Sequence, residues 1–111
     1  LAAAPRLSEM SLELDYGEDV FCDLQEAGCF LRRQNPKLGG RFTKAAQETF
    51  AYLSAHPHLG RPRPEFDVEG MRSWAVKGFR RYLIFYVPTD TRLRVLRVLE
   101  GSRDLSAEFS Q

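Results

Sequence analysis

The sequence predicts a single α+β domain in which a helical hairpin packs on one face of a small antiparallel sheet. The first half holds two segments whose apolar residues recur at helical spacing, and the second half holds three runs rich in aromatic and β-branched residues. The length of 111 residues fits one domain. Helices followed by a run of strands are typical of α+β domains, whereas α/β domains alternate the two.

Two helices are predicted between residues 18 and 55. The first, 18–34, begins with two acids and ends with two arginines, as the helix dipole favours. Asn35-Pro36 predicts the start of the second helix, with Asn35 as N-cap, and His56-Pro57 predicts its end. The predicted apolar stripes are Val20, Phe21, Leu24, Ala27 and Leu31 in the first helix, and Leu38, Phe42, Ala45, Ala46, Thr49, Phe50 and Leu53 in the second.

The strands are predicted from alternation and from turn residues. Residues 11–16 alternate apolar and polar side chains, which predicts a short first strand. Prolines and glycines make 57–70 a loop, and the runs 71–76, 81–87 and 93–99 then form a three-stranded antiparallel meander. The order is therefore β-α-α-β-β-β. We expect an extension at 1–10, a domain at 11–105 and a polar tail at 106–111, either frayed or a short helix.

The composition indicates a cytoplasmic protein without membrane association. The chain has no run of 18 apolar residues, and its start lacks the basic and apolar regions of a signal peptide. Cys22 and Cys29 lie about 10 Å apart along the first predicted helix, too far for a disulfide, so we expect free thiols. We expect no metal site either, because His56 and His58 lie far from both cysteines in sequence.

Charge is unevenly distributed along the chain. Residues 1–60 hold six Lys or Arg against eight Asp or Glu, whereas 61–103 hold ten against five. The second half is therefore the candidate for meeting an acidic partner, and a solvated basic face is the alternative. Aromatic residues interleave with these arginines, but packing in the core or across strands is favoured over base stacking for Trp74, Tyr82 and Tyr86.

Six short segments stand out by their order and spacing. They are Asp23-Leu24, Asn35-Pro36 followed by Arg41-Phe42, His56–Pro62, Gly70-Met71-Arg72, Tyr82–Tyr86 and Arg97–Asp104. Together, over about residues 11–105, they resemble the RelE/ParE toxin superfamily, and most closely the ParE-like plasmid-stabilisation toxins. No single segment is specific by itself. The family commonly has His where Glu100 stands.

The resemblance implies the toxin half of a type II toxin–antitoxin system, with a cognate antitoxin as partner. ParE-like members inhibit DNA gyrase by binding, and RelE-like members cut mRNA on the ribosome. We expect no cofactor. We expect this toxin to form oligomers only through the antitoxin complex.

The residues favour the ParE-like activity over the endonuclease. The RelE-like pattern has Arg where Leu83 stands and Tyr near Phe109, and neither residue can supply that chemistry. Arg72 and Arg103 do match the pattern, so an endonuclease would use these two with Glu100. For binding the target or the antitoxin, we expect contacts from Arg72, Arg81, Arg97 and Arg103.

Overall fold

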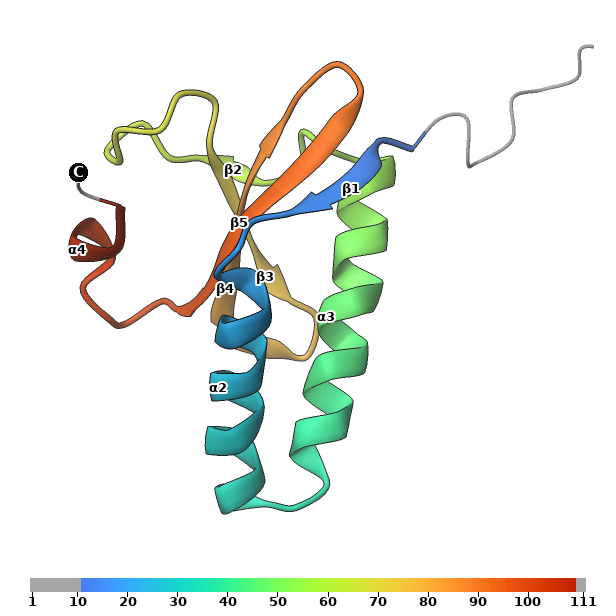
Figure 1. Cartoon of the computed structure of the whole chain (residues 1–111), viewed down its shortest axis with the longest axis vertical. Helices are drawn as coiled ribbons and strands as arrows, with labels where there is room; N and C mark the ends of the chain where they lie inside the picture. Colours follow the sequence, from blue (N-terminus) through green and yellow to red (C-terminus); the bar gives the residue numbers. More distant parts are fainter. Residues whose placement is uncertain (1–10, 110–111) are drawn as a thin grey trace, which may run out of the picture.

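The computed structural model describes residues 11–109 and has the predicted succession of one strand, two helices and a sheet (Figure 1). Its elements are β1 (Glu13–Tyr16), α2 (Val20–Gln34), α3 (Leu38–Ala55), β2 (Arg61–Pro62), β3 (Arg72–Val76), β4 (Phe79–Pro88), β5 (Arg92–Glu100) and α4 (Leu105–Phe109). The predicted extension at 1–10 lies outside the described residues. Within residues 11–109, no helix is long and apolar enough to cross a membrane.

The sheet has five strands in the order β1-β5-β4-β3-β2. The antiparallel meander β3-β4-β5 is confirmed. Two details differ from the prediction. β1 pairs in parallel with β5, with Glu13 opposite Arg92, so the sheet is mixed rather than wholly antiparallel. Arg61–Pro62, inside the predicted loop, pairs with the start of β3 as a two-residue edge strand.

Asn35 ends the first helix instead of capping the second. Its backbone N–H donates to the carbonyl of Leu31 at 3.0 Å, which closes the last turn of α2. Its side-chain oxygen accepts a hydrogen bond from the N–H of Lys37 at 3.0 Å, an Asx turn that places Pro36 in the connection. The predicted helix start was therefore too early, and Lys37 is the N-cap residue of α3.

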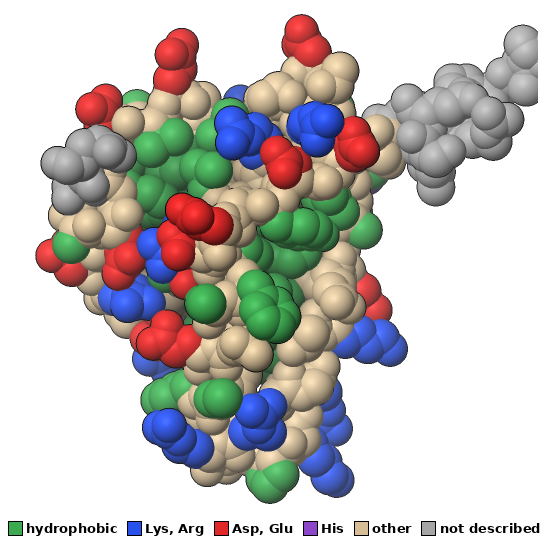
Figure 2. Space-filling view, in the orientation of Figure 1, with side chains coloured by type: hydrophobic (Ala, Val, Ile, Leu, Met, Phe, Trp, Pro, Cys, Tyr) green, Lys and Arg blue, Asp and Glu red, His purple; other side chains and the backbone are tan. Residues whose placement is uncertain are grey.

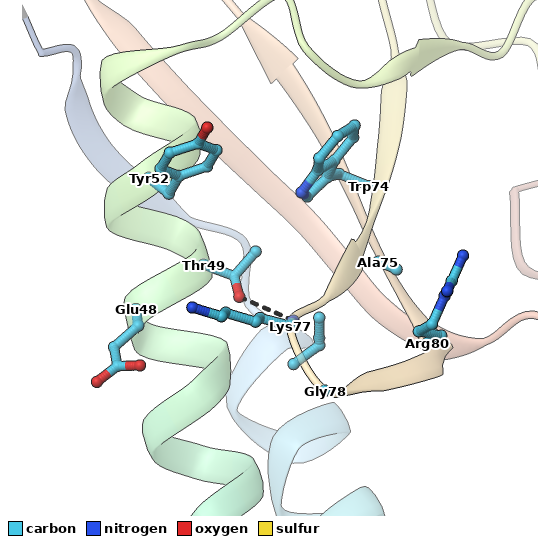
Figure 3. A pocket seen from close by; sticks show the side chains of 9 residues that line it. Glu48, Thr49, Tyr52, Trp74, Ala75, Lys77, Gly78 and Arg80 are labelled. Atoms are coloured by element: carbon cyan, nitrogen blue, oxygen red, sulfur yellow. Dashed lines mark hydrogen bonds between the residues drawn. The ribbon is translucent and has the colours of Figure 1, made fainter.

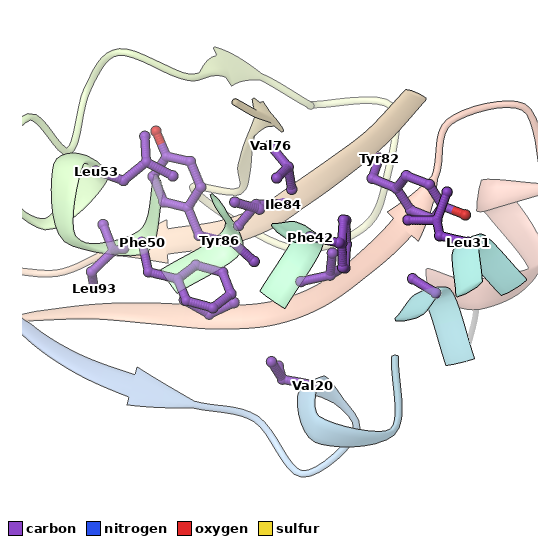
Figure 4. Packing of buried hydrophobic residues seen from close by; sticks show 14 residues of the cluster. Val20, Leu31, Phe42, Phe50, Leu53, Val76, Tyr82, Ile84, Tyr86 and Leu93 are labelled. Carbon is purple, nitrogen blue, oxygen red and sulfur yellow. The ribbon is translucent and has the colours of Figure 1, made fainter. Parts of the chain in front are cut away.

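The main core lies between the helical hairpin and the sheet (Figure 4). Phe42, Phe50 and Leu53 of α3 are fully buried against the sheet, as the predicted stripe requires. Phe21 was wrongly included in the stripe of α2, because it is 68% exposed. It follows Val20 by one residue, about 100° further round the helix, and so leaves the buried face.

The opposite face of the sheet carries a second apolar cluster, formed by Met71, Phe85, Leu99 and Phe109. The sequence analysis predicted a helical hairpin on one face of the sheet and no element that covers this other face. Phe66, from the predicted loop, and Phe109, from the predicted tail, pack together with their ring centroids 5.2 Å apart and cover this face. The loop and α4 therefore contribute to the fold.

Candidate functional site

A β-bulge in β5 determines where Arg97 points. Phe85 lies opposite Arg97 but Tyr86 lies opposite Val95, so Leu96 is an extra residue in β5. Plain alternation along β5 predicts that Arg97 shares a face with Leu93, Val95 and Leu99. The bulge reverses the alternation, so Arg97 is on the face of Leu99 and not on that of Leu93 and Val95. Arg97 instead reaches out of the sheet toward α2 and α4.

Asp23 of α2 forms a bidentate ion pair with Arg97. The Nε and Nη2 atoms of Arg97 donate to the two carboxylate oxygens at 2.8 and 2.9 Å, and the backbone N–H of Val98 donates to Asp23 at 3.0 Å. Asp23 is 5% exposed. Its hydrogen bonds raise the pKa of Arg97 further above the ordinary arginine value, so this cation is permanent. The Asp23-Leu24 segment therefore joins α2 to the sheet edge.

Two more of the predicted arginines lie near the end of β5. Arg97 also donates to Glu108 at 3.0 Å, and Arg103 pairs with the other oxygen of that carboxylate at 3.2 Å. Arg81 pairs with Glu100 at 3.1 Å, and its side chain is 80% exposed. Asp23, Arg97, Glu108 and Arg103 are called the Arg97 network below.

Arg72 lies apart from this network and supports the loop after α3. Its Nη1 atom donates to the carbonyls of His58 and Gly60 at 3.2 and 2.7 Å. The Tyr86 hydroxyl donates to the carbonyl of Pro57 and accepts from the N–H of Gly60. The Pro-x-x-Gly pattern, from Pro57 to Gly60, is thus the part of the loop that hydrogen bonds from Arg72 and Tyr86 attach to the sheet.

The structure brings together two of the three possible nuclease residues, because Glu100 and Arg103 line one pocket, but Arg72 lies elsewhere. Arg72 lies opposite Tyr86, and Glu100 lies opposite Tyr82, on the two strands that flank β4. Tyr82 and Tyr86 are four residues apart in β4, so Glu100 and Arg72 are separated by about 13 Å along the strand direction.

An apolar groove of about 710 Å³ runs between α3 and the β3–β4 hairpin (Figure 3). Thr49 holds its two sides together, because its hydroxyl accepts from the backbone N–H of Lys77 at 3.1 Å and donates to the carbonyl of Ala45. Trp74 projects into the groove and is 36% exposed, although its predicted place was in the core or in a cross-strand pair. The lining is formed by Glu48, Thr49, Tyr52, Trp74, Ala75, Val76, Lys77, Gly78 and Arg80.

The groove adjoins an open edge of the sheet. β2 pairs only with Arg72 and Ser73, so among the described residues no strand covers the outer side of β3 from Trp74 to Val76. An edge strand beside an apolar groove can accept an extended peptide, with backbone hydrogen bonds on one side and side-chain anchors in the groove. Sequence reasoning missed this site, because it treated 57–70 as a loop and gave no indication of how much of β3 the short strand Arg61–Pro62 would cover.

The comparisons with known proteins agree with this architecture. A family model described as "ParE toxin of type II toxin-antitoxin system, parDE" matches residues 17–105. No curated protein matches the chain. A solved structure of the chromosomal ParDE toxin–antitoxin system from P. aeruginosa has a TM-score of 0.68 at 16% identity, covering 82% of this chain and 97% of that chain, and shows the same fold. The family match spans nearly the whole folded domain, and the chain therefore belongs to the ParE toxin family of type II toxin–antitoxin systems.

Proposed function

We propose that this toxin arrests growth in the cytoplasm by binding a cellular protein such as DNA gyrase, and that a cognate antitoxin neutralises it. The family match over residues 17–105 is the observation that carries the proposal. Inhibition by binding needs a shaped, charged surface and no reacting groups. The exposed Arg81 and the groove beside β3 provide such a surface.

The placement of the possible nuclease residues also favours binding over RNA cleavage. Cleavage needs a base, an acid and cations that converge on one phosphate. Arg72 is occupied by two backbone carbonyls, Glu100 by Arg81, and Arg103 by Glu108. Leu83 and the buried Phe109 stand where the endonuclease pattern has Arg and Tyr.

We propose further that the antitoxin tail places apolar anchors in the groove and adds a strand to the open part of β3. Its acids would pair with the arginines expected from the sequence, Arg72, Arg81, Arg97 and Arg103. Within the chain, Glu100 already pairs with Arg81, and Glu108 with Arg97 and Arg103, so an acidic tail competes with these two carboxylates. Arg81 is the most exposed of the three and should respond most to the tail.

The experiment that tests the mode of action is induction of the toxin alone in growing cells. We expect growth arrest, inhibition of DNA supercoiling by purified gyrase, and no new mRNA 5′ ends within minutes. Codon-phased cuts in translated messages would replace this proposal with the RelE-like endonuclease. A double variant, Arg72→Ala with Arg103→Ala, then reports whether cleavage depends on the residues that match the nuclease pattern.

The antitoxin interface is tested by calorimetric titration at two salt concentrations. Arg81→Glu should weaken binding, and the loss should shrink at high salt, because an exposed ion pair is screened. Trp74→Ala should weaken binding equally at both salts, since it removes an apolar anchor. Wild-type affinity in both variants would place the antitoxin elsewhere on the toxin.

A further inference from the structure

The outer face of α2, turned away from the sheet, exposes side chains that a solvated helix face rarely carries. Phe21 is 68% exposed and Phe30 is 45% exposed. They are nine residues apart, about 180° round the helix, and so lie at the two opposite edges of this face. Cys22 and Cys29 are both exposed and free, seven residues apart, and therefore lie on the same side of the helix. Apolar and thiol side chains in contact with water indicate a surface that meets a partner.

This exposed face has a reverse symmetry about the midpoint between Gln25 and Glu26. Four pairs of exposed side chains at equal distances from that midpoint are either identical or opposite in charge, whereas the central exposed pair, Gln25 and Glu26, is neither. Figure 2 shows the result as acidic side chains over the start of α2, apolar ones along it and basic ones at its far end. The matched positions are Cys22 with Cys29, Phe21 with Phe30, and the acids Glu18 and Asp19 with Arg33 and Arg32.

We propose that this face is a self-association surface, on which two copies of the chain pair through antiparallel α2 helices. A twofold interface uses one patch twice, so the patch must be complementary to itself when reversed. Reversal of α2 sets Glu18 and Asp19 of one copy against the arginine pair of the other, and brings each Cys22 beside a Cys29. Parallel pairing would set the acids of the two copies against each other at one end of the helices, and the arginines against each other at the other end.

The proposal goes beyond the toxin's inhibitory activity and departs from the expectation of oligomers only through the antitoxin. Buried residues on the inner side of α2, Val20, Ala27 and Leu31, fix the helix to the core and so hold the outer face in one orientation. One 15-residue helix is only about 22 Å long, so the interface is small and the dimer dissociates at low concentration.

Disulfide formation between single-cysteine variants tests the antiparallel arrangement. We use Cys22→Ser, Cys29→Ser and their equimolar mixture, with diamide as thiol oxidant. Each disulfide takes one proton and one electron from each of two thiols, and diamide is reduced to the hydrazine. In the antiparallel dimer, identical cysteines lie about 10 Å apart along the helix, beyond disulfide reach, whereas Cys22 and Cys29 of different copies are adjacent.

We expect the mixture to form a covalent dimer at least tenfold faster than either variant alone, and denaturant to abolish the difference. Variants that each cross-link as fast as the mixture would overturn the antiparallel arrangement. No cross-linking in any sample would overturn self-association through this face.

Charge swapping tests the same interface without covalent chemistry. The variants are Glu18→Lys with Asp19→Lys, and Arg32→Glu with Arg33→Glu. Sedimentation equilibrium should show each variant as a monomer at concentrations where wild type pairs, and their mixture as a dimer. Circular dichroism checks that each variant keeps its helices. A wild type that stays monomeric at every concentration, or a mixture that stays monomeric, would contradict the proposal.

Discussion

Gly60 shows how one residue determines the form of a loop. A Cβ atom added there would fall on the Tyr86 hydroxyl and lie 2.8 Å from the carbonyl oxygen of Ser73. We expect Gly60→Ala to lower the free energy of unfolding by about 2 kcal/mol, the usual cost of overpacking, measured by urea denaturation. The matched control is Gly40→Ala in α3, where a new Cβ meets nothing within 4 Å. It should stabilise the protein by about 0.5–1 kcal/mol, because alanine favours helix.

Asp23 shows how a buried charge depends on its partner. Asp23→Asn would leave the half-buried Arg97 without its bidentate acceptor, and we expect a loss of about 3 kcal/mol in unfolding free energy. Arg81→Ala is the control, because it breaks the exposed pair with Glu100 and should cost less than about 1 kcal/mol. Similar losses in the two variants would mean that the Arg97 network contributes no more than a surface pair.

Tyr86 predicts a loss of stability at alkaline pH. Burial raises its pKa above the ordinary tyrosine value, so the folded state keeps the phenol proton that the unfolded chain releases. The protonated phenol of Tyr86 therefore adds to the free energy of unfolding. This stabilisation is complete below about pH 10 and is lost as the pH rises through the pKa of Tyr86 in the folded state. Tyr86→Phe should therefore reduce the fall in unfolding free energy between about pH 8 and about pH 11. Part of the fall should remain, because burial also raises the pKa of Tyr16 and Tyr82.

At the scale of elements, α4 is a short helix with a structural contact. Phe109 is 7% exposed and packs against Phe85 at 5.0 Å between ring centroids. We expect Phe109→Ala to lower the unfolding free energy by about 3 kcal/mol, at the low end for a buried phenylalanine because the chain end can relax. Phe21→Ala, at an exposed position, should change it by less than about 0.5 kcal/mol. An equal effect of the two would show that α4 is detached in solution.

The elements that sequence reasoning predicted well are those with a strong period. The stripe of α3 and the meander follow from spacing alone, since a long periodic run has few alternative structures. The bulge at Leu96 could not be predicted, because it depends on the partner strand and not on β5 itself. The roles of Phe66 and Phe109 were missed for a similar reason, as each lies in a short segment without a period.

At the scale of the whole molecule, the predicted arginines prove to be divided between different tasks. Arg72 and Arg97 hold the fold, through the loop carbonyls and through Asp23. Arg81 is the one most open to a partner. Composition gives the number of positive charges, but the acids that neutralise them come from distant parts of the chain, as Asp23 lies 74 residues from Arg97. Charge counts along the sequence therefore overstate how many arginines are free.

The parallel pairing of β1 with β5 has a consequence for the order of events during synthesis. β5 is made after the other four strands, yet it lies between β1 and β4 and receives the Asp23 contact. Until β5 leaves the ribosome, β1 has no neighbour and the sheet cannot close. Contacts at such sequence separation form slowly. The β1-β5-β4 part of the sheet can therefore form only after β5 has been made, and we expect any activity that depends on the complete sheet to appear only from that point in translation.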